Sequence, residues 1–270
     1  ATTTTGIAIY LASTSNTDVT GNNATATGNG IAIYLASSSN NNVAGNNATS
    51  PTGAAFFIIS SLNNNFTNNN ATATACGGVA IHLRDGSYSN RLFSNTFTAS
   101  GGSGAIRLGD NGNQGSMSNN SGTFSNDTIT CTNCAYSLFV NQSSNVTLVN
   151  VTFNRTNYTI GQWAYPENPN FINLSWYAKF NVTTQDFNPV ANALINITNL
   201  TGATPMISAL ATGSDGTTGW QPITEWIGNA TTGTNYTPHT TTVYSNGSNS
   251  TTFNITQSQV YTMQVNLVTA

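Results

Sequence analysis

Five ionisable side chains are spaced so that they could meet in a chain that otherwise carries little charge. Only 5% of the 270 residues are charged, yet His82, Arg84, Asp85, Arg107 and Asp110 fall within two short apolar runs. If the runs stack as strands, Asp85 lies about 5 Å above Asp110. Carboxylates at that distance repel or share a cation, so both are candidate calcium ligands or saccharide contacts. The alternative, which we favour, is an arginine–aspartate network that balances charge on an outer face.

A Cys-x-x-Cys pair is the second candidate for chemistry. Cys131 and Cys134 could be a redox pair, half of a metal site or a local disulfide. A zinc site needs four ligands, and no second Cys or His pair has a suitable spacing. We therefore expect buried or locally bridged cysteines near a turn, and no cofactor apart from the calcium considered above. Cys76 leaves an odd count, which would allow a disulfide between subunits.

Asn-x-Ser/Thr sequons are dense along the whole chain. Each is weak by itself, because a chain rich in Asn and Thr makes them by chance, but their density suits an exported glycoprotein. We therefore expect an extracellular, cell-surface location and N-linked glycans. The candidate sites are Asn23, Asn47, Asn65, Asn70, Asn126, Asn145, Asn150, Asn154, Asn173, Asn181, Asn196, Asn229, Asn235 and Asn254.

Composition argues against several classes of partner. The net charge is −3, so there is no electrostatic case for nucleic acid or an anionic membrane. No apolar run reaches about 18 residues, and no membrane span is expected. We expect a mature form from which a signal peptide has been cleaved, because the sequence begins at Ala1 and shows no signal-peptide pattern. Aromatic residues make up 10% of the chain, which favours an ordered fold over disorder.

A near-identical repeat has to position these side chains. Gly6–Ser13 recurs as Gly30–Ser37, 24 residues later, and related runs begin at Gly53, Gly78, Gly104 and Ala135. Alternation of apolar residues indicates strands. One unit cannot bury its own apolar face, so the copies must stack. The sequence therefore predicts a parallel β-helix of about six to seven coils.

Stacking converts the repeat into columns of side chains. We expect two inward columns, made of Ile9, Ile33, Phe56, Ile81, Ile106 and Tyr136, and of Leu11, Leu35, Ile58, Leu83, Leu108 and Leu138. The two-residue period points a third column outward, made of Tyr10, Tyr34, Phe57, His82, Arg107 and Ser137. The aromatic part, Tyr10, Tyr34 and Phe57, is a candidate assembly face or sugar platform. Asparagine-rich turns are expected to stack their amides into ladders.

The pattern changes after residue 162, and we expect three segments. Residues 1–162 form the β-helix, residues 163–173 a turn-rich linker, and residues 174–270 an Ig-like β-sandwich of longer strands. The strands expected in the sandwich are 176–183, 193–198, 206–211, 240–244, 251–256 and 261–268. His239 is expected to be structural. The tryptophans are expected to pack rather than to bind sugar, and they are Trp163, Trp176, Trp220 and Trp226.

Two resemblances cover most of the chain. Coils of the form Gly-Ile-x-Ile-x-Leu-x-x-Ser, with Asn-x-Val eight positions on, resemble the right-handed β-helix repeats of the pectate-lyase-like superfamily. The segments Trp176–Phe180, Asn188–Ala193, Ser214–Gly216 and Thr237–His239 look like an Ig-like or carboxypeptidase-regulatory-like module. In archaeal surface proteins such a module often follows a β-helix. The resemblance implies the fold but not one function, because the superfamily includes lyases, adhesins, and S-layer, sheath and filament subunits.

We expect a structural subunit that polymerises with its own copies rather than an enzyme. The first coil begins at residue 6 without an evident cap, and an open parallel end leaves backbone groups unpaired. A second subunit, or its Ig-like domain by strand addition, could cover that end and give an open, head-to-tail homopolymer. The alternatives are a glycan-binding adhesin, and a polysaccharide lyase or hydrolase. An enzyme needs acids and bases that converge on one face, and only the cluster around Asp85 and Asp110 qualifies.

Overall fold

The computed structural model describes residues 1–110, 120–142, 144–161, 169–199, 205–245 and 247–265. These ranges contain 27 strands and no helix, so the predicted all-β class is confirmed. None of the described residues belongs to a helix that could cross a bilayer. The chain divides into two compact units, one of residues 1–172 with 228–232, the other of residues 173–227 with 233–270.

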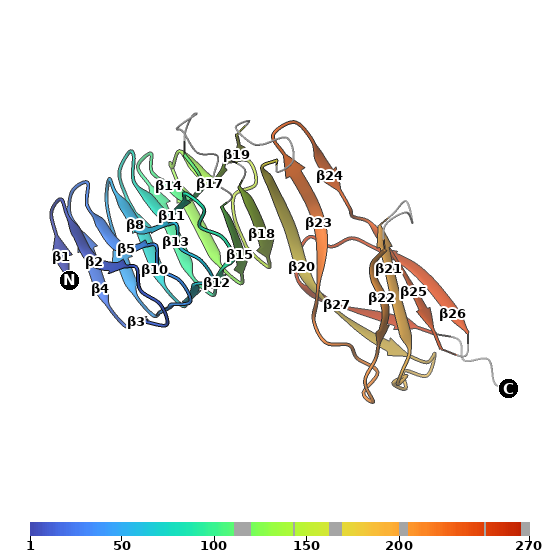
Figure 1. Cartoon of the computed structure of the whole chain (residues 1–270). Coiled ribbons are helices and arrows are strands. Elements are labelled where there is room, and N and C mark those ends of the chain that lie inside the picture. The colour runs from blue at the N-terminus through green and yellow to red at the C-terminus, as the bar shows by residue number, and fades with distance from the viewer. Residues whose placement is uncertain (111–119, 143, 162–168, 200–204, 246, 266–270) are drawn as a thin grey trace. The chain divides into compact units, whose positions relative to one another are not determined.

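The first unit is a parallel β-helix, as predicted, in which six coils each contribute one strand to each of three sheets and β19 adds a seventh strand to sheet 2 (Figure 1). Sheet 1 contains β1 (Thr2–Thr3), β4 (Asn23–Ala26), β7 (Asn47–Thr49), β10 (Asn70–Ala73), β13 (Thr96–Ser100) and β16 (Thr128–Thr132). Sheet 2 contains β2 (Ile7–Ala12), β5 (Ile31–Ala36), β8 (Ala54–Ile59), β11 (Val79–Arg84), β14 (Gly104–Leu108), β17 (Tyr136–Val140) and β19 (Tyr158–Ile160). Sheet 3 contains β3 (Asp18–Thr20), β6 (Asn42–Ala44), β9 (Asn65–Thr67), β12 (Asn90–Phe93), β15 (Ser121–Ser125) and β18 (Asn145–Val149).

The apolar columns form the core, with one correction at the sixth coil. Ile9, Ile33, Phe56, Ile81 and Ile106 are paired in register as expected, but the next partner is Leu138. Tyr136 instead pairs with Gly104, and Val140 pairs with Leu108. The predicted alignment was therefore wrong by two residues in this coil. Gly104 permits the observed pairing, because a Cβ there would overlap the Tyr136 ring.

Single residues with left-handed backbone turn the chain at the corners between sheets. One corner has Ser13, Ser37 and Ser60 at φ between 48° and 52°. The next has Asn16, Asn40 and Asn63 at φ between 54° and 58°. Asparagine accepts this conformation better than most residues with a side chain. The local geometry of these corners therefore explains part of the asparagine content.

Asparagines, all but Asn22 of them buried, form the expected amide ladders along the coils. In one ladder Asn22, Asn46, Asn69 and Asn95 are linked in order. Each gives its side-chain Nδ2–H to the Oδ1 of the next asparagine at 3.0–3.1 Å. A second ladder joins Asn41, Asn64 and Asn90 in the same way. Buried amides cost free energy unless they are paired, so the ladders hold successive coils in one register.

The second unit contains eight strands in two groups. An antiparallel sheet is formed by β22 (Pro205–Ala211), β21 (Leu194–Asn199), β25 (His239–Tyr244) and β26 (Ser248–Phe253). The other group contains β24 (Gly233–Asn235), β23 (Gln221–Asn229) and β20 (Phe171–Thr183), with β27 (Gln259–Gln264) parallel to β20. β20 already begins at Phe171, inside the predicted linker. Strand β23 was missed, since Pro222 and Gly228 interrupt its alternating pattern.

Candidate functional site

Three aromatic side chains form a stacked row on the outer face of sheet 2. Tyr10, Tyr34 and Phe57 occupy the same register position in β2, β5 and β8. The ring centroids lie 5.0 Å apart for Tyr10 and Tyr34, and 5.1 Å apart for Tyr34 and Phe57. Tyr10 is 55% exposed. We call these three residues the aromatic row.

The stacking geometry limits what the aromatic row can bind. Tyr10 and Tyr34 stack with only 25° between their ring planes, so Tyr34 has one face against Tyr10. Phe57 packs against Tyr34 from the following coil. Tyr34 therefore presents mostly its ring edge to its surroundings, whereas Tyr10, on the end strand β2, has only one face covered by another ring of the row. Edges pack well into the side chains of a protein surface, whereas a sugar ring would need an open aromatic face.

The outward column continues beyond the aromatic row as a charged cluster. The His82 ring lies 5.1 Å from the Phe57 ring, and the Arg107 guanidinium carbon lies 5.6 Å from the Phe139 ring centre. Phe139 occupies the position predicted for Ser137, which follows from the shift of the sixth coil. His82 is only 6% exposed, although its strand position points it outward, because its neighbours in the column cover it.

Arg84 lies between the two aspartates that were candidate calcium ligands. Its Nε is 3.0 Å from Asp85 Oδ2, and its Nη2 is 3.0 Å from Asp110 Oδ2. Arg107 Nη2 is 3.2 Å from Asp110 Oδ1. This is the charge-balancing network that we favoured, and a cation would have to displace Arg84. The described residues also contain no group of three or more His, Cys, Asp or Glu that could hold a metal.

Burial favours the neutral form of His82, whereas the hydrogen bond from His82 favours the ionised form of Asp110. Burial lowers the pKa of His82, against the opposing effect of its hydrogen bond to Asp110. His82 Nε2 lies 3.0 Å from the Gly109 carbonyl and 3.4 Å from Asp110 Oδ1, so Nε2–H is the donor. That hydrogen bond is the main cause of the lowered pKa of Asp110, with the two arginines as smaller causes. In this cluster both aspartates pair with arginine.

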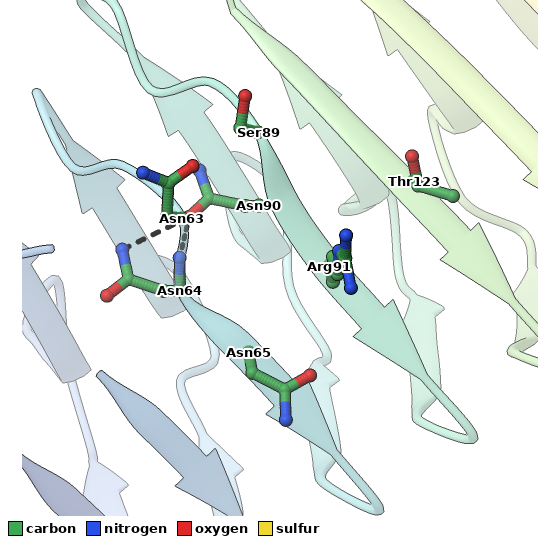
Figure 2. Close-up of a pocket in the computed structure, with 7 residues that line it drawn as sticks. All are labelled: Asn63, Asn64, Asn65, Ser89, Asn90, Arg91 and Thr123. Carbon is green, nitrogen blue, oxygen red and sulfur yellow. Dashed lines mark hydrogen bonds between the residues drawn. The ribbon is translucent and has the colours of Figure 1, made fainter. Parts of the chain in front are cut away.

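A polar groove lies on a different face, over sheet 3 (Figure 2). Its volume is about 620 Å³, and its lining residues are Asn63, Asn64, Asn65, Ser89, Asn90, Arg91 and Thr123. Arg91 of β12 pairs in register with Asn65 of β9 and Thr123 of β15. In the described part of the chain no carboxylate forms an ion pair with Arg91. The groove offers amides and one cation to a polar or acidic ligand.

Sequence reasoning missed this groove. Its residues come from three coils, and Asn65 was singled out only as a glycosylation sequon, not as part of a groove. The Asn-x-Val pattern of the repeat could have revealed it. Aligning the fourth coil on that pattern places Arg91 beside Asn65.

The other candidate residues have the following positions. Cys131 and Cys134 are joined by a disulfide bond, and Cys76 is a free, exposed thiol. Trp176 is buried and donates its indole N–H to Glu225, whereas Trp220 is 50% exposed. His239 is fully buried and its Nε2 contacts the Thr224 carbonyl. Trp163 lies outside the described residues.

None of the candidate glycosylation asparagines is buried. Eight are exposed, namely Asn23, Asn47, Asn65, Asn70, Asn154, Asn229, Asn235 and Asn254. The other six are half-buried, namely Asn126, Asn145, Asn150, Asn173, Asn181 and Asn196.

Comparisons with known proteins bear mainly on the first unit. Residues 1–103 match the family model described as "Periplasmic copper-binding protein (NosD)", a family of parallel β-helices. A solved structure of ORF18 from Geobacillus virus E2 is similar over 82% of this chain, at 10% identity and a TM-score of 0.31. This chain covers 65% of that chain, and the TM-score is too low for the likeness to support a conclusion about fold or function. No curated protein matches.

Proposed function

We propose that this chain is a structural subunit of an extracellular polymer, in which the aromatic row packs against a neighbouring copy. The observation that carries the proposal is the row itself. Tyr10, Tyr34 and Phe57 give an apolar strip on a rigid sheet, with the ring edge of Tyr34 outward and Tyr10 more than half exposed. Apolar strips of this kind on exported proteins commonly mark contacts with other proteins.

The scaffold supports a structural role. Three parallel sheets and two amide ladders tie each coil to the next, so the first unit is rigid along its length. The match of residues 1–103 to a periplasmic family supports export. Exposed sequons suit an outer location. The family name mentions copper, but we assign no copper site to this chain.

A second candidate function is binding of an acidic saccharide in the groove of sheet 3. The observation that favours it is Arg91, an exposed cation among amide side chains. Amides and a guanidinium together can recognise hydroxyl and carboxylate groups. This would make the chain an adhesin instead of a polymer subunit.

Removal of the aromatic row tests the proposal. Tyr10→Ser combined with Tyr34→Ser should abolish assembly of the secreted chain, measured by sedimentation velocity over a concentration series. Phe93→Ser is the matched control, because Phe93 is a 44% exposed aromatic on sheet 3, and it should leave assembly unchanged. Unchanged assembly of the tyrosine variant would contradict the proposal. A wild-type chain that stays monomeric and binds an acidic polysaccharide through Arg91 would favour the second candidate.

A further inference from the structure

Three sequon asparagines form a straight row on the outer face of sheet 1. Asn23 pairs in register with Asn47, and Asn47 pairs with Asn70. All three are exposed. They begin strands β4, β7 and β10, and each is followed by a fully buried alanine. We call Asn23, Asn47 and Asn70 the sequon row.

The structure separates two neighbouring asparagines that look alike in the sequence. Asn46 is 1% exposed and belongs to a buried amide ladder, whereas Asn47 is exposed. The same division holds for Asn69 and Asn70. In each case only the exposed asparagine heads a sequon. The threonine two positions later, such as Thr49, shares its outer face because strand side chains alternate.

The asparagines of the sequon row are too close for independent modification. Neighbouring strands in a sheet lie about 4.8 Å apart, and Asn70 Nδ2 contacts Asn47 Oδ1 at 3.3 Å. A pyranose ring with its substituents is wider than one strand spacing. Asn23 and Asn70 are separated by two spacings, about 9.6 Å, with Asn47 between them.

We infer that the sequon row carries N-linked glycans in an alternating pattern. A folded molecule holds glycans on Asn23 and Asn70 together, or on Asn47 alone, but not on two neighbours. This rule holds whether the sugar is attached before or after folding, since a chain with neighbouring glycans would be hindered in stacking its coils. The inference rests on the export that the proposed function requires.

The same pattern assigns roles to two faces of the β-helix. The strands β2, β5, β8, β11 and β14 of sheet 2 contain no asparagine, so no glycan can grow from the strands that carry the aromatic row. The sequon row lies on sheet 1. Glycans would therefore keep sheet 1 facing solvent and leave sheet 2 free to contact a protein neighbour.

Glycan counting on one peptide tests the alternation. Arg84 is the first Lys or Arg in the sequence, so trypsin leaves the whole sequon row on a single peptide that ends at Arg84. The folded, secreted chain from a host that glycosylates exported sequons would be digested, and glycan positions read by electron-transfer fragmentation. We expect joint occupancy of Asn23 and Asn70, and joint occupancy of Asn47 with a neighbour at least tenfold below the product of the single occupancies.

Variants make the test specific. The double variant Asn23→Gln, Asn70→Gln should raise occupancy at Asn47 several-fold, whereas Asn235→Gln, at an exposed sequon of the second unit, should not. Neighbouring glycans at the frequency of independent sites would overturn the inference, as would a secreted chain without glycans on the row. A chain with alternating glycans that never assembles would instead contradict the proposed function and leave this inference standing.

Discussion

Asp127 occupies the last place of an amide ladder that is otherwise built from asparagine. Its Oδ1 accepts hydrogen bonds from Asn95 N and Nδ2, at 2.6 and 3.0 Å. Its Oδ2 is buried without a partner. In Asn95 the equivalent atom is an N–H group that donates to the Phe66 carbonyl. One coil later the acceptor that corresponds to the Phe66 carbonyl is the Leu92 carbonyl, because Leu92 pairs with Phe66. A protonated Oδ2 of Asp127 would supply the donor that the Nδ2–H group supplies in Asn95.

Burial raises the pKa of Asp127 to about 7, from 3.8 for an unperturbed aspartate, against the opposing effect of the Asn95 hydrogen bonds. Asp127 is 2% exposed, and the other causes of its shift are backbone and amide groups rather than charges. The folded-state pKa lies above the unfolded one. The contribution of protonated Asp127 to the free energy of unfolding is therefore complete below about pH 4. It is lost as the pH rises through about 7, at roughly 1.4 kcal/mol per pH unit.

Asp127→Asn should remove this pH dependence. The amide cannot ionise, and its N–H can donate where Oδ2 has no partner. Urea unfolding at pH 8 should show the variant more stable than the wild type by a few kcal/mol, with a much smaller difference at pH 4.5. Asp18→Asn, at an exposed aspartate of β3, should leave the wild-type profile in place. Equal stability of wild type and Asp127→Asn at pH 8 would contradict this reading of the ladder.

The register between the fifth and sixth coils depends on one pair of residues that differ in size, Gly104 and Tyr136. Each of the first five coils begins with a glycine followed by an apolar run, and their alignment could be predicted from the sequence. The sixth begins Ala135-Tyr136, and apolar matching alone placed Tyr136 against Ile106. The actual register pairs Tyr136 with Gly104. This pairing depends on the steric fit of a large ring beside a residue without a side chain, and not on polarity.

Gly104→Ala should loosen the contact between the fifth and sixth coils. The added Cβ would overlap the Tyr136 ring, and overpacking of this kind costs about 1–3 kcal/mol. In a Tyr136→Ala background the same substitution should cost much less, because the overlap is gone. Thermal unfolding of the four members of this double-mutant cycle measures the coupling. Additive effects would show that the glycine does not set the register.

At the scale of the whole chain, sequence reasoning was most accurate where the repeat is most regular. It identified the β-helix, the amide ladders and the position of the aromatic row. It did not find strand β23, whose alternating pattern Pro222 and Gly228 interrupt, or the groove around Arg91, which is assembled from residues of three coils. The polymer proposal likewise depends on how complete surfaces meet, which no single motif encodes.

Electron microscopy of the secreted, glycosylated chain tests the central proposal most directly. We predict ordered polymers in negative stain at micromolar concentration, with the sheet 2 face of one subunit against a neighbour and the sequon row toward solvent. Loss of those polymers in the variant with Tyr10→Ser and Tyr34→Ser should accompany retention of a folded β-helix. Dispersed single particles at every concentration, from wild-type protein that is folded and glycosylated, would contradict the account.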